Sequence, residues 1–208
     1  MTATESRSRN PRGEGSRLRA DIVAAAAAIL DETGDEQAVT LRAVARQIGI
    51  AAPSIYRHFA DRQAILVALV GEAFAEFEQR LRDAAADQDP VVRLRAVCDA
   101  YLEYARSRPQ RYRVMFGGLW SAPDAVAAEA MTSDAAAELG QGALRVIAGA
   151  LQDCVTAGRS TSDDPLADAV ALWLGLHGLA HQRAVSRAFP WPPGIVDRLV
   201  VPLAHLRS

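Results

Sequence analysis

Arginine gathers in one short stretch of this 208-residue chain, residues 40–66, and guanidinium groups bind phosphate oxygens and guanine edges. The stretch holds Arg42, Arg46, Arg57 and Arg62 against a single acidic residue, Asp61. The whole chain is nearly neutral, with a formal net charge of −2 and a pI of about 6.1. A locally basic face on such a chain favours specific, salt-sensitive DNA binding over indiscriminate coating of nucleic acid. A solvated charged face is the alternative, above all for Arg46.

Two histidines and two cysteines are the other candidates for chemistry. His177 and His181 have the four-residue spacing that can hold a metal on one helical face. Only Gly, Leu and Ala separate them, so the Glu that zinc proteases use as a general base is missing. Lining a pocket or an interface is the favoured interpretation. Cys98 and Cys154 have no partner spacing and are expected to be buried thiols. We therefore expect neither a metal nor another cofactor.

Enzymatic and membrane signatures are missing from the sequence. It contains no Gly-x-Ser-x-Gly elbow, no phosphate-binding loop and no convincing acid–base pair. No apolar run reaches the ~18 residues that a membrane span needs, and the N-terminus lacks an apolar signal core. We expect a cytoplasmic protein that is not an enzyme and does not bind membranes.

Two short helices joined by a tight turn are expected to position the arginines. The first helix has an apolar face made by Leu41, Val44, Ala45 and Ile48. Gly49 ends that helix where a positive φ is wanted, and Pro53 suits the first turn of the next helix. The outward face of the second helix carries Ala52, Ser54, Tyr56, Arg57 and His58. Such a unit holds its second helix in the major groove of DNA.

The same stretch resembles the DNA-binding domain of the tetracycline-repressor (TetR) family. The string V-T-L-R-x-V-A-x-x-x-G-I-x-x-P-S-I-Y-R-H-F-x-D-R-x-x-I-L carries the resemblance, which is dense over about residues 17–70. It implies that Thr40 starts the second helix and touches phosphate, and that Arg42 reaches a base. Tyr56 and His58 would grip the DNA backbone. The residues expected to contact DNA are Thr40, Arg42, Ala52, Pro53, Ser54, Tyr56, Arg57, His58 and Arg62.

The chain departs from the family pattern at three places. Arg62 stands where the family usually has Lys, so the charge is kept. Ala51 replaces the usual N-cap Ser of the recognition helix, and no Glu or Gln follows Thr40 at the capping-box position. The missing cap is expected to cost roughly 1 kcal/mol of local stability.

The whole chain is expected to be all-α, because Ala and Leu abound and β-branched alternation is absent. Residues 1–16 should be a disordered Arg-rich arm, which either reaches the minor groove or is inert. A three-helix helix-turn-helix domain should span residues 17–63, and a ligand-binding and dimerisation domain residues 64–208. We expect Asp61 to cap a helix that runs from Arg62 into the second domain, and further helices to start at Asp89, Pro123, Asp164 and Pro192-Pro193. The Pro123 helix should last until Gly158, either continuous or interrupted near Ser133.

The second domain resembles a TetR subgroup of the WHG type, through A-L-W-L-G-L-H-G-L-A-H at residues 171–181 and P-x-x-Y-x-x-M-F at residues 109–116. Candidates for a ligand cavity are Tyr101, Tyr104, Met115, Phe116, Trp120, Trp173 and His177, with plain core packing as the alternative for the aromatic residues. By resemblance, the last two helices form a dimer interface with their copies, where the candidates are Ala171, Gly175, Gly178 and His181.

These features predict a ligand-responsive transcriptional regulator, of the repressor type. As a homodimer it would bind a palindromic double-stranded DNA operator, and a small apolar or amphipathic effector would release it. A helical binding module that has lost DNA recognition is the competing interpretation. The uncapped Ala51 and the small side chains of Ala52 and Ser54 leave it open.

Overall fold

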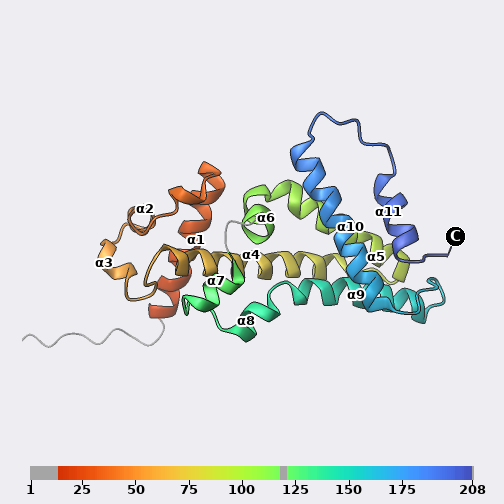
Figure 1. Cartoon of the computed structure of the whole chain (residues 1–208), viewed down its shortest axis with the longest axis horizontal. Helices are drawn as coiled ribbons and strands as arrows, with labels where there is room; N and C mark the ends of the chain where they lie inside the picture. The colour runs from red at the N-terminus through yellow and green to blue at the C-terminus, as the bar shows by residue number, and fades with distance from the viewer. Residues whose placement is uncertain (1–13, 118–120, 208) are drawn as a thin grey trace, which may run out of the picture. The chain divides into compact units, whose positions relative to one another are not determined.

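The computed structural model describes residues 14–117 and 121–207, and its regular elements there are helices (Figure 1). The predicted all-α class is confirmed. The chain divides into two compact units, residues 1–69 and 70–208. Trp120 and residues 1–13 of the predicted arm lie outside the described residues. Residues 14–16 were expected to be disordered, but they belong to the first helix, which begins at Glu14.

The first unit contains α1 (Glu14–Thr33), the 3-10 turn η1 (Glu36–Ala38), α2 (Leu41–Gln47), α3 (Ala52–Ile55) and the beginning of α4 (Arg62–Ala84). Its core consists of fully buried side chains from the four α-helices and from the turn after α3, among them Ile22, Leu30, Val44, Ile55, Phe59 and Ile65. Helix α1 packs against α2, and α2 against α3. Gly49 has a φ of +70° directly after α2, as the sequence predicts.

Helix starts in the first unit follow the predicted side-chain caps. The Thr40 hydroxyl accepts the Ala43 N–H at 3.1 Å and begins α2. The Asp61 carboxylate accepts the Ala64 N–H at 2.8 Å and begins α4. Helix α3 has Pro in its first turn, and Ala51 before it provides no side-chain cap. One of the three starts is therefore left without the capping bond that the other two have.

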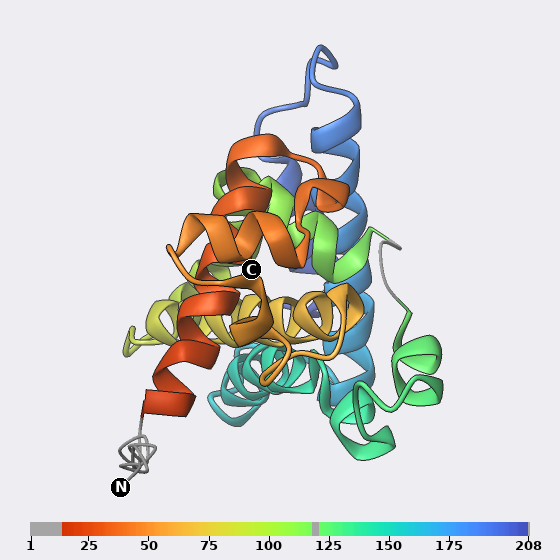
Figure 2. The ribbon, with the colours of Figure 1, turned by 90° about the vertical axis from the view of Figure 1, so that its left-hand side faces the viewer.

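The second unit contains the rest of α4 and seven more helices. They are α5 (Pro90–Ser107), α6 (Pro109–Phe116), α7 (Ala122–Ala127), α8 (Ser133–Glu138), α9 (Gln141–Thr156), α10 (Pro165–Val185) and α11 (Ile195–Leu203). Helices α5, α9 and α10 pack on one another and enclose the core, and α11 lies against α10. The short helices α7 and α8, green in Figure 2, pack on each other. Among the described residues, no helix has the length and apolar character that crossing a membrane requires.

The Ala-rich stretch from Pro123 to Gly158 is not one long helix, nor one interrupted only near Ser133. It is divided into α7, α8 and α9. The last division falls at Gly140, whose φ is +80° and whose missing Cβ would lie 3.1 Å from the Phe74 ring. The final helix also differs from expectation, because it starts at Ile195, after Gly194 with a φ of +71°, and not at the two prolines.

A cluster of ion pairs joins α4 to the start of α6. The carboxylate of Glu76 pairs with Arg80 at 3.0 Å, with Arg108 at 3.3 Å and with Arg111. Burial raises the pKa of the Glu76 carboxyl, but the charge of Arg111 and the hydrogen bonds from all three arginines outweigh it and hold that pKa below its usual range. The Glu76 cluster is therefore ionised at neutral pH.

Candidate nucleic-acid interface and ligand cavity

Three cationic side chains of α2 and the turn after α3 stand free in solvent. Arg42, Arg46 and Arg57 are exposed, and in the described part of the chain none has a carboxylate within 4.0 Å. Tyr56, at the end of α3, has 60% of its surface exposed, which is unusual for a tyrosine that has a core beside it. These exposed guanidinium and phenol groups on one helix-turn-helix unit are donors that have no hydrogen-bond partner among the described residues.

Other residues predicted to contact DNA lie on the same unit with different surroundings. Pro53 is exposed, whereas Ala52, Ser54 and His58 are half-buried. Thr40 is exposed and uses its hydroxyl oxygen as an acceptor for the cap of α2. A capping hydroxyl keeps its own O–H, so it can still donate a hydrogen bond to a phosphate.

Arg62 is the exception among the arginines. Its Nε donates to the Val39 carbonyl at 3.0 Å and its Nη2 to the Glu36 carbonyl at 2.5 Å, and the residue is half-buried. These two bonds join the start of α4 to the chain that leads into α2. The structure thus gives Arg62 internal partners, where the resemblance implies a contact with DNA.

A cavity of about 310 Å³ lies in the second unit. Its walls are mostly aromatic and aliphatic side chains: Phe74, Phe77, Phe116, Leu139, Ala143, Leu144 and Trp173. The rings of Phe74 and Phe116 meet edge to face, with centroids 5.5 Å apart. Gln141 is the polar side chain of the lining, and its amide nitrogen already donates to the Ala137 carbonyl at 2.7 Å. Such a cavity suits a predominantly apolar ligand.

A buried polar network borders two of the cavity walls. The Tyr112 hydroxyl lies 2.7 Å from Nδ1 of His177 and 3.1 Å from the Tyr101 hydroxyl. The His177 ring also contacts the rings of Phe116 and Trp173, with centroids 4.9 and 5.9 Å apart. Burial raises the pKa of Tyr101 to about 12 and also raises that of Tyr112. Both phenols are therefore protonated.

The imidazole of His177 is neutral at physiological pH. Burial lowers its pKa, and the nearby His181 lowers it further. A neutral imidazole whose Nδ1 accepts a hydrogen bond from a phenol O–H carries its own proton on Nε2. The described residues contain no cluster of three or more His, Cys, Asp or Glu side chains that could hold a metal.

The predicted ligand residues fall into two groups. Phe116 and Trp173 line the cavity. Tyr101, Tyr104, Met115 and His177 do not belong to its lining. The Tyr104 hydroxyl donates to the Ala73 carbonyl at 3.2 Å, so the alternative of core packing describes this residue. Phe74 and Phe77 also line the cavity although they were not among the predicted ligand residues, and nothing in the sequence marked Gln141 or Leu144.

The two cysteines are buried, as expected. Burial raises the pKa of Cys98 to about 12 and that of Cys154 to about 11. Both residues are thiols and not thiolates at neutral pH, so they lack the form that attacks electrophiles or binds metals.

An apolar stripe runs along the outer face of α10. Leu166, Leu174 and Val185 have 60%, 56% and 62% of their surfaces exposed. Gly178 and His181, both predicted at a dimer interface, are exposed on the same helix, and Ala171 is half-buried. These three exposed apolar side chains lie on one side of α10 and are surface that a partner helix could cover.

The structure gives Gly175 a different neighbour from the one that the sequence predicts. A Cβ at this position would lie 3.0 Å from a methyl carbon of Leu203 and 3.1 Å from those of Leu199. Both leucines belong to α11 of the same chain. Gly175 therefore allows α11 to approach α10 within one chain, whereas we expected it to face a second copy.

Comparisons with known proteins cover both units. A family model described as bacterial regulatory proteins, tetR family, matches residues 22–69, and one described as tetracyclin repressor-like, C-terminal domain, matches residues 94–203. An HTH-type transcriptional regulator of Mycobacterium tuberculosis is 27% identical over 143 residues, which are 64% of this chain and 54% of that protein. The nucleoid occlusion factor SlmA of Photobacterium profundum is 29% identical over 100 residues, 48% of this chain and 51% of that one. The chain thus spans about half the length of these curated relatives.

Solved structures match over nearly the whole length. A protein of unknown function from Rhodococcus sp. RHA1 has a TM-score of 0.72 and 25% identity, covering 94% of this chain and 95% of that chain. A TetR-family transcriptional regulator from Pectobacterium atrosepticum has a TM-score of 0.64 and 23% identity, covering 94% and 93%. These likenesses establish that the helical fold is shared.

Proposed function

Because this chain belongs to the TetR family of bacterial regulatory proteins, we propose that it is a ligand-responsive repressor that binds a palindromic operator as a dimer. The observation that carries DNA binding is the set of exposed donors without protein partners on the helix-turn-helix unit. Arg42 and Arg57 supply guanidinium groups and Tyr56 a phenol. Basic and hydroxyl donors of this kind fix a protein on the DNA backbone, and a guanidinium can also read guanine.

Within this unit the residues have separate roles in the proposal. Arg42 is long enough to read a base edge, whereas Ala52 and Ser54 are short. Tyr56 and Thr40 hold phosphates through their O–H groups. One unit provides too few base contacts for useful specificity. A dimer solves this by placing two units on half-sites roughly 34–36 Å apart, one helical turn of DNA.

The outer stripe of α10 supports dimerisation. Leu166, Leu174 and Val185 expose apolar surface that water solvates poorly, and a second copy of the helix can cover it. In a two-fold arrangement each residue is used twice, so a modest stripe yields a larger buried area.

The cavity beside Phe116 and Trp173 supports an effector with an apolar body. Two of its walls, Phe74 and Phe77, belong to α4, the helix whose first residue, Arg62, hydrogen-bonds the chain before α2. An effector that prefers a different position of α4 would shift the population away from the DNA-binding state. An effector that binds both states equally would have no effect on operator binding.

The decisive experiment is selection from random genomic fragments followed by binding at several salt concentrations. We expect an imperfect palindrome, and a log–log salt plot with a slope of about −0.9 per neutralised phosphate. Selection that enriches no sequence, or binding that ignores salt, would reject the proposal and leave a helical binding module.

Two substitutions distinguish a residue that recognises bases from a residue that binds the DNA backbone. Arg42→Ala should cost about 1–3 kcal/mol on the selected operator and relax the preference at one base pair. Tyr56→Phe removes only an O–H and should weaken binding to all sequences alike. The measurement is affinity for the operator and for single-base variants of it. If both substitutions reduce discrimination equally, the two roles have been assigned wrongly.

A further inference from the structure

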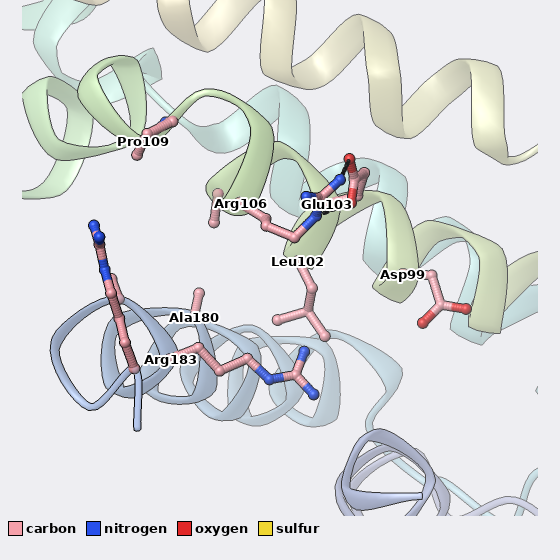
Figure 3. A pocket seen from close by; sticks show the side chains of 10 residues that line it. Asp99, Leu102, Glu103, Arg106, Pro109, Ala180 and Arg183 are labelled. Atoms are coloured by element: carbon pink, nitrogen blue, oxygen red, sulfur yellow. Dashed lines mark hydrogen bonds and ion pairs between the residues drawn. The ribbon is translucent and has the colours of Figure 1, made fainter. Parts of the chain in front are cut away.

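A groove of about 640 Å³ lies between α5 and the end of α10 (Figure 3). It shares no lining residue with the cavity at Phe116 and Trp173. Its apolar part is formed by Leu102, Pro109 and Ala180, which Figure 3 shows on the facing helices. The small Ala184 adds to the same wall as Ala180 and leaves the space open. A volume of this size is typical of small-molecule sites.

The α5 wall of the groove carries one ion pair and one further carboxyl group. Arg106 donates two hydrogen bonds to Glu103, both at 2.7 Å, so these charges neutralise each other. Asp99 also belongs to this wall. Burial raises the pKa of its carboxyl and the neighbouring Asp197 raises it further, while Arg95 and Arg183 oppose that rise.

On its other side the groove is lined by Arg183, in the last turn of α10, and by Arg187, in the turn that follows this helix. Among the residues that the structure describes, neither Arg183 nor Arg187 has a carboxylate within 4.0 Å. Arg187 lies beyond the end of α10 at Val185, and the charge of Arg183 also acts on Asp99, which lines the same groove. In Figure 3 the Arg183 side chain extends along the groove below Leu102. An anion in the groove would supply the close partner that these guanidinium groups lack in the described part of the chain.

We propose that the groove is a second small-molecule site and that its ligand is an amphipathic carboxylate. The carboxylate pairs with Arg183 and Arg187, because a guanidinium matches a carboxylate with two parallel hydrogen bonds. The hydrocarbon chain lies on Leu102, Pro109 and Ala180. This site goes beyond the function proposed above and does not depend on operator binding.

Arginines at the end of a helix also stabilise its exposed carbonyl groups, and this role requires no ligand. The test therefore uses a ligand pair that differs only in charge. Octanoate and octanol have the same hydrocarbon chain, and calorimetry on the full-length protein measures the affinity of each. We expect octanoate to bind at least about tenfold more tightly than octanol.

The double variant Arg183→Gln/Arg187→Gln should lose this preference. The matched control Arg82→Gln/Arg145→Gln removes the same charge from exposed arginines of α4 and α9 and should keep it. Ala184→Trp fills the groove with both arginines in place and should abolish octanoate binding. This variant tests the proposed site even if the double arginine variant does not fold.

Leu144→Trp fills the other cavity and should leave octanoate binding in the groove unchanged. Equal affinity for octanoate and octanol, undiminished octanoate binding by the double arginine variant, or loss of binding only in Leu144→Trp would each overturn the proposal. So would the absence of any octanoate binding. None of these outcomes depends on DNA, so the operator proposal stands or falls separately.

Discussion

At the scale of single residues, the arginines of the helix-turn-helix unit differ in what their donors do. Arg42, Arg46 and Arg57 are exposed and have no carboxylate partner in residues 14–117 and 121–207, whereas Arg62 donates to two backbone carbonyls. A lysine ammonium is a point charge and cannot reproduce a fork of two directed bonds. The planar guanidinium, and not only its charge, is therefore needed at position 62.

Arg62→Lys tests this distinction, because it keeps the charge and removes the fork. We expect the protein to lose about 1–3 kcal/mol of unfolding free energy, since the Val39 carbonyl loses its Arg62 donor and the Glu36 carbonyl loses one of its donors. Chemical denaturation measures the loss. The control Arg46→Lys, at an exposed position, should change stability by less than about 0.5 kcal/mol. Unchanged stability together with a shallower salt dependence of DNA binding would instead place Arg62 on a phosphate.

The lowered pKa of His177 predicts how stability depends on pH. At a pH between its folded pKa and the ordinary 6.5, the unfolded chain binds a proton that the folded chain does not. Stability therefore rises with pH across this window, is complete above it, and is lost as the pH falls. Thermal unfolding followed from about pH 7.5 to about pH 5.5 should show the loss.

His177→Gln should flatten that dependence, although it lowers stability at every pH because the bond to Tyr112 is lost. His58→Gln, on the other unit, should keep the slope of the unmodified protein. An unchanged slope in the His177 variant would mean that another group is responsible.

At the scale of secondary-structure elements, α3 is a helix that begins without a side-chain cap. Ala51 has the extended backbone of an N-cap residue, with φ −71° and ψ 133°, but no side-chain acceptor. Ala51→Ser should supply a side-chain acceptor for the Ser54 N–H, which here donates to the Ala51 carbonyl at 2.8 Å, and should stabilise the protein by roughly 1 kcal/mol. Denaturant titration measures the gain. Ala52→Ser places the same hydroxyl inside the helix and should give no gain; equal effects of the two would argue against capping.

The sequence indicated most helix starts because a cap is a local device. Asp61, Asp89 and Asp164 each accept a backbone N–H within three residues, and each stands where its pattern predicts a start. The break at Gly140 depends instead on Phe74, which is far away in the sequence. An Ala-rich stretch favours helix throughout and carries no sign of such a neighbour.

The same difference between local and long-range features separates the DNA-binding site from the ligand cavity. Exposed arginines next to a helix-turn-helix pattern are a local feature, so the sequence pointed to them. Which aromatic residues line a cavity depends on how α4, α6 and α10 meet. Phe116 and Trp173 reach the cavity, whereas the equally aromatic Tyr104 fills the core. Composition and spacing do not distinguish these cases.

At the scale of the whole molecule, the proposed dimer depends on the outer stripe of α10. Leu174→Arg should yield a folded monomer that binds the operator weakly, because it places charge in the centre of the apolar stripe. Sedimentation measures the assembly state, and circular dichroism the helix content. Val92→Arg, at another exposed apolar position, on α5, should remain dimeric. A Leu174→Arg protein that is still a dimer would move the interface elsewhere.

Gly175→Leu should behave differently from Leu174→Arg. Its side chain would overlap Leu199 and Leu203 within the same chain, and overpacking costs about 1–3 kcal/mol. We therefore expect a lower unfolding temperature whether or not the protein is a dimer. Thermal unfolding at two protein concentrations separates the effects, because a dimer's midpoint depends on concentration. A stable Gly175→Leu monomer would show that this glycine does face a second copy.

The Glu76 cluster bears on how long the second unit stays folded once it has formed. Arg80 is one helical turn from Glu76, but Arg108 and Arg111 are 32 and 35 residues away in sequence. The two distant pairs close only after α5 has folded back and α6 has formed behind it, because a long loop must first lose its freedom. Interactions made that late stabilise the native state more than the transition state for folding. Removing the Glu76 carboxylate would therefore shorten the lifetime of the folded unit while leaving its rate of formation nearly unchanged.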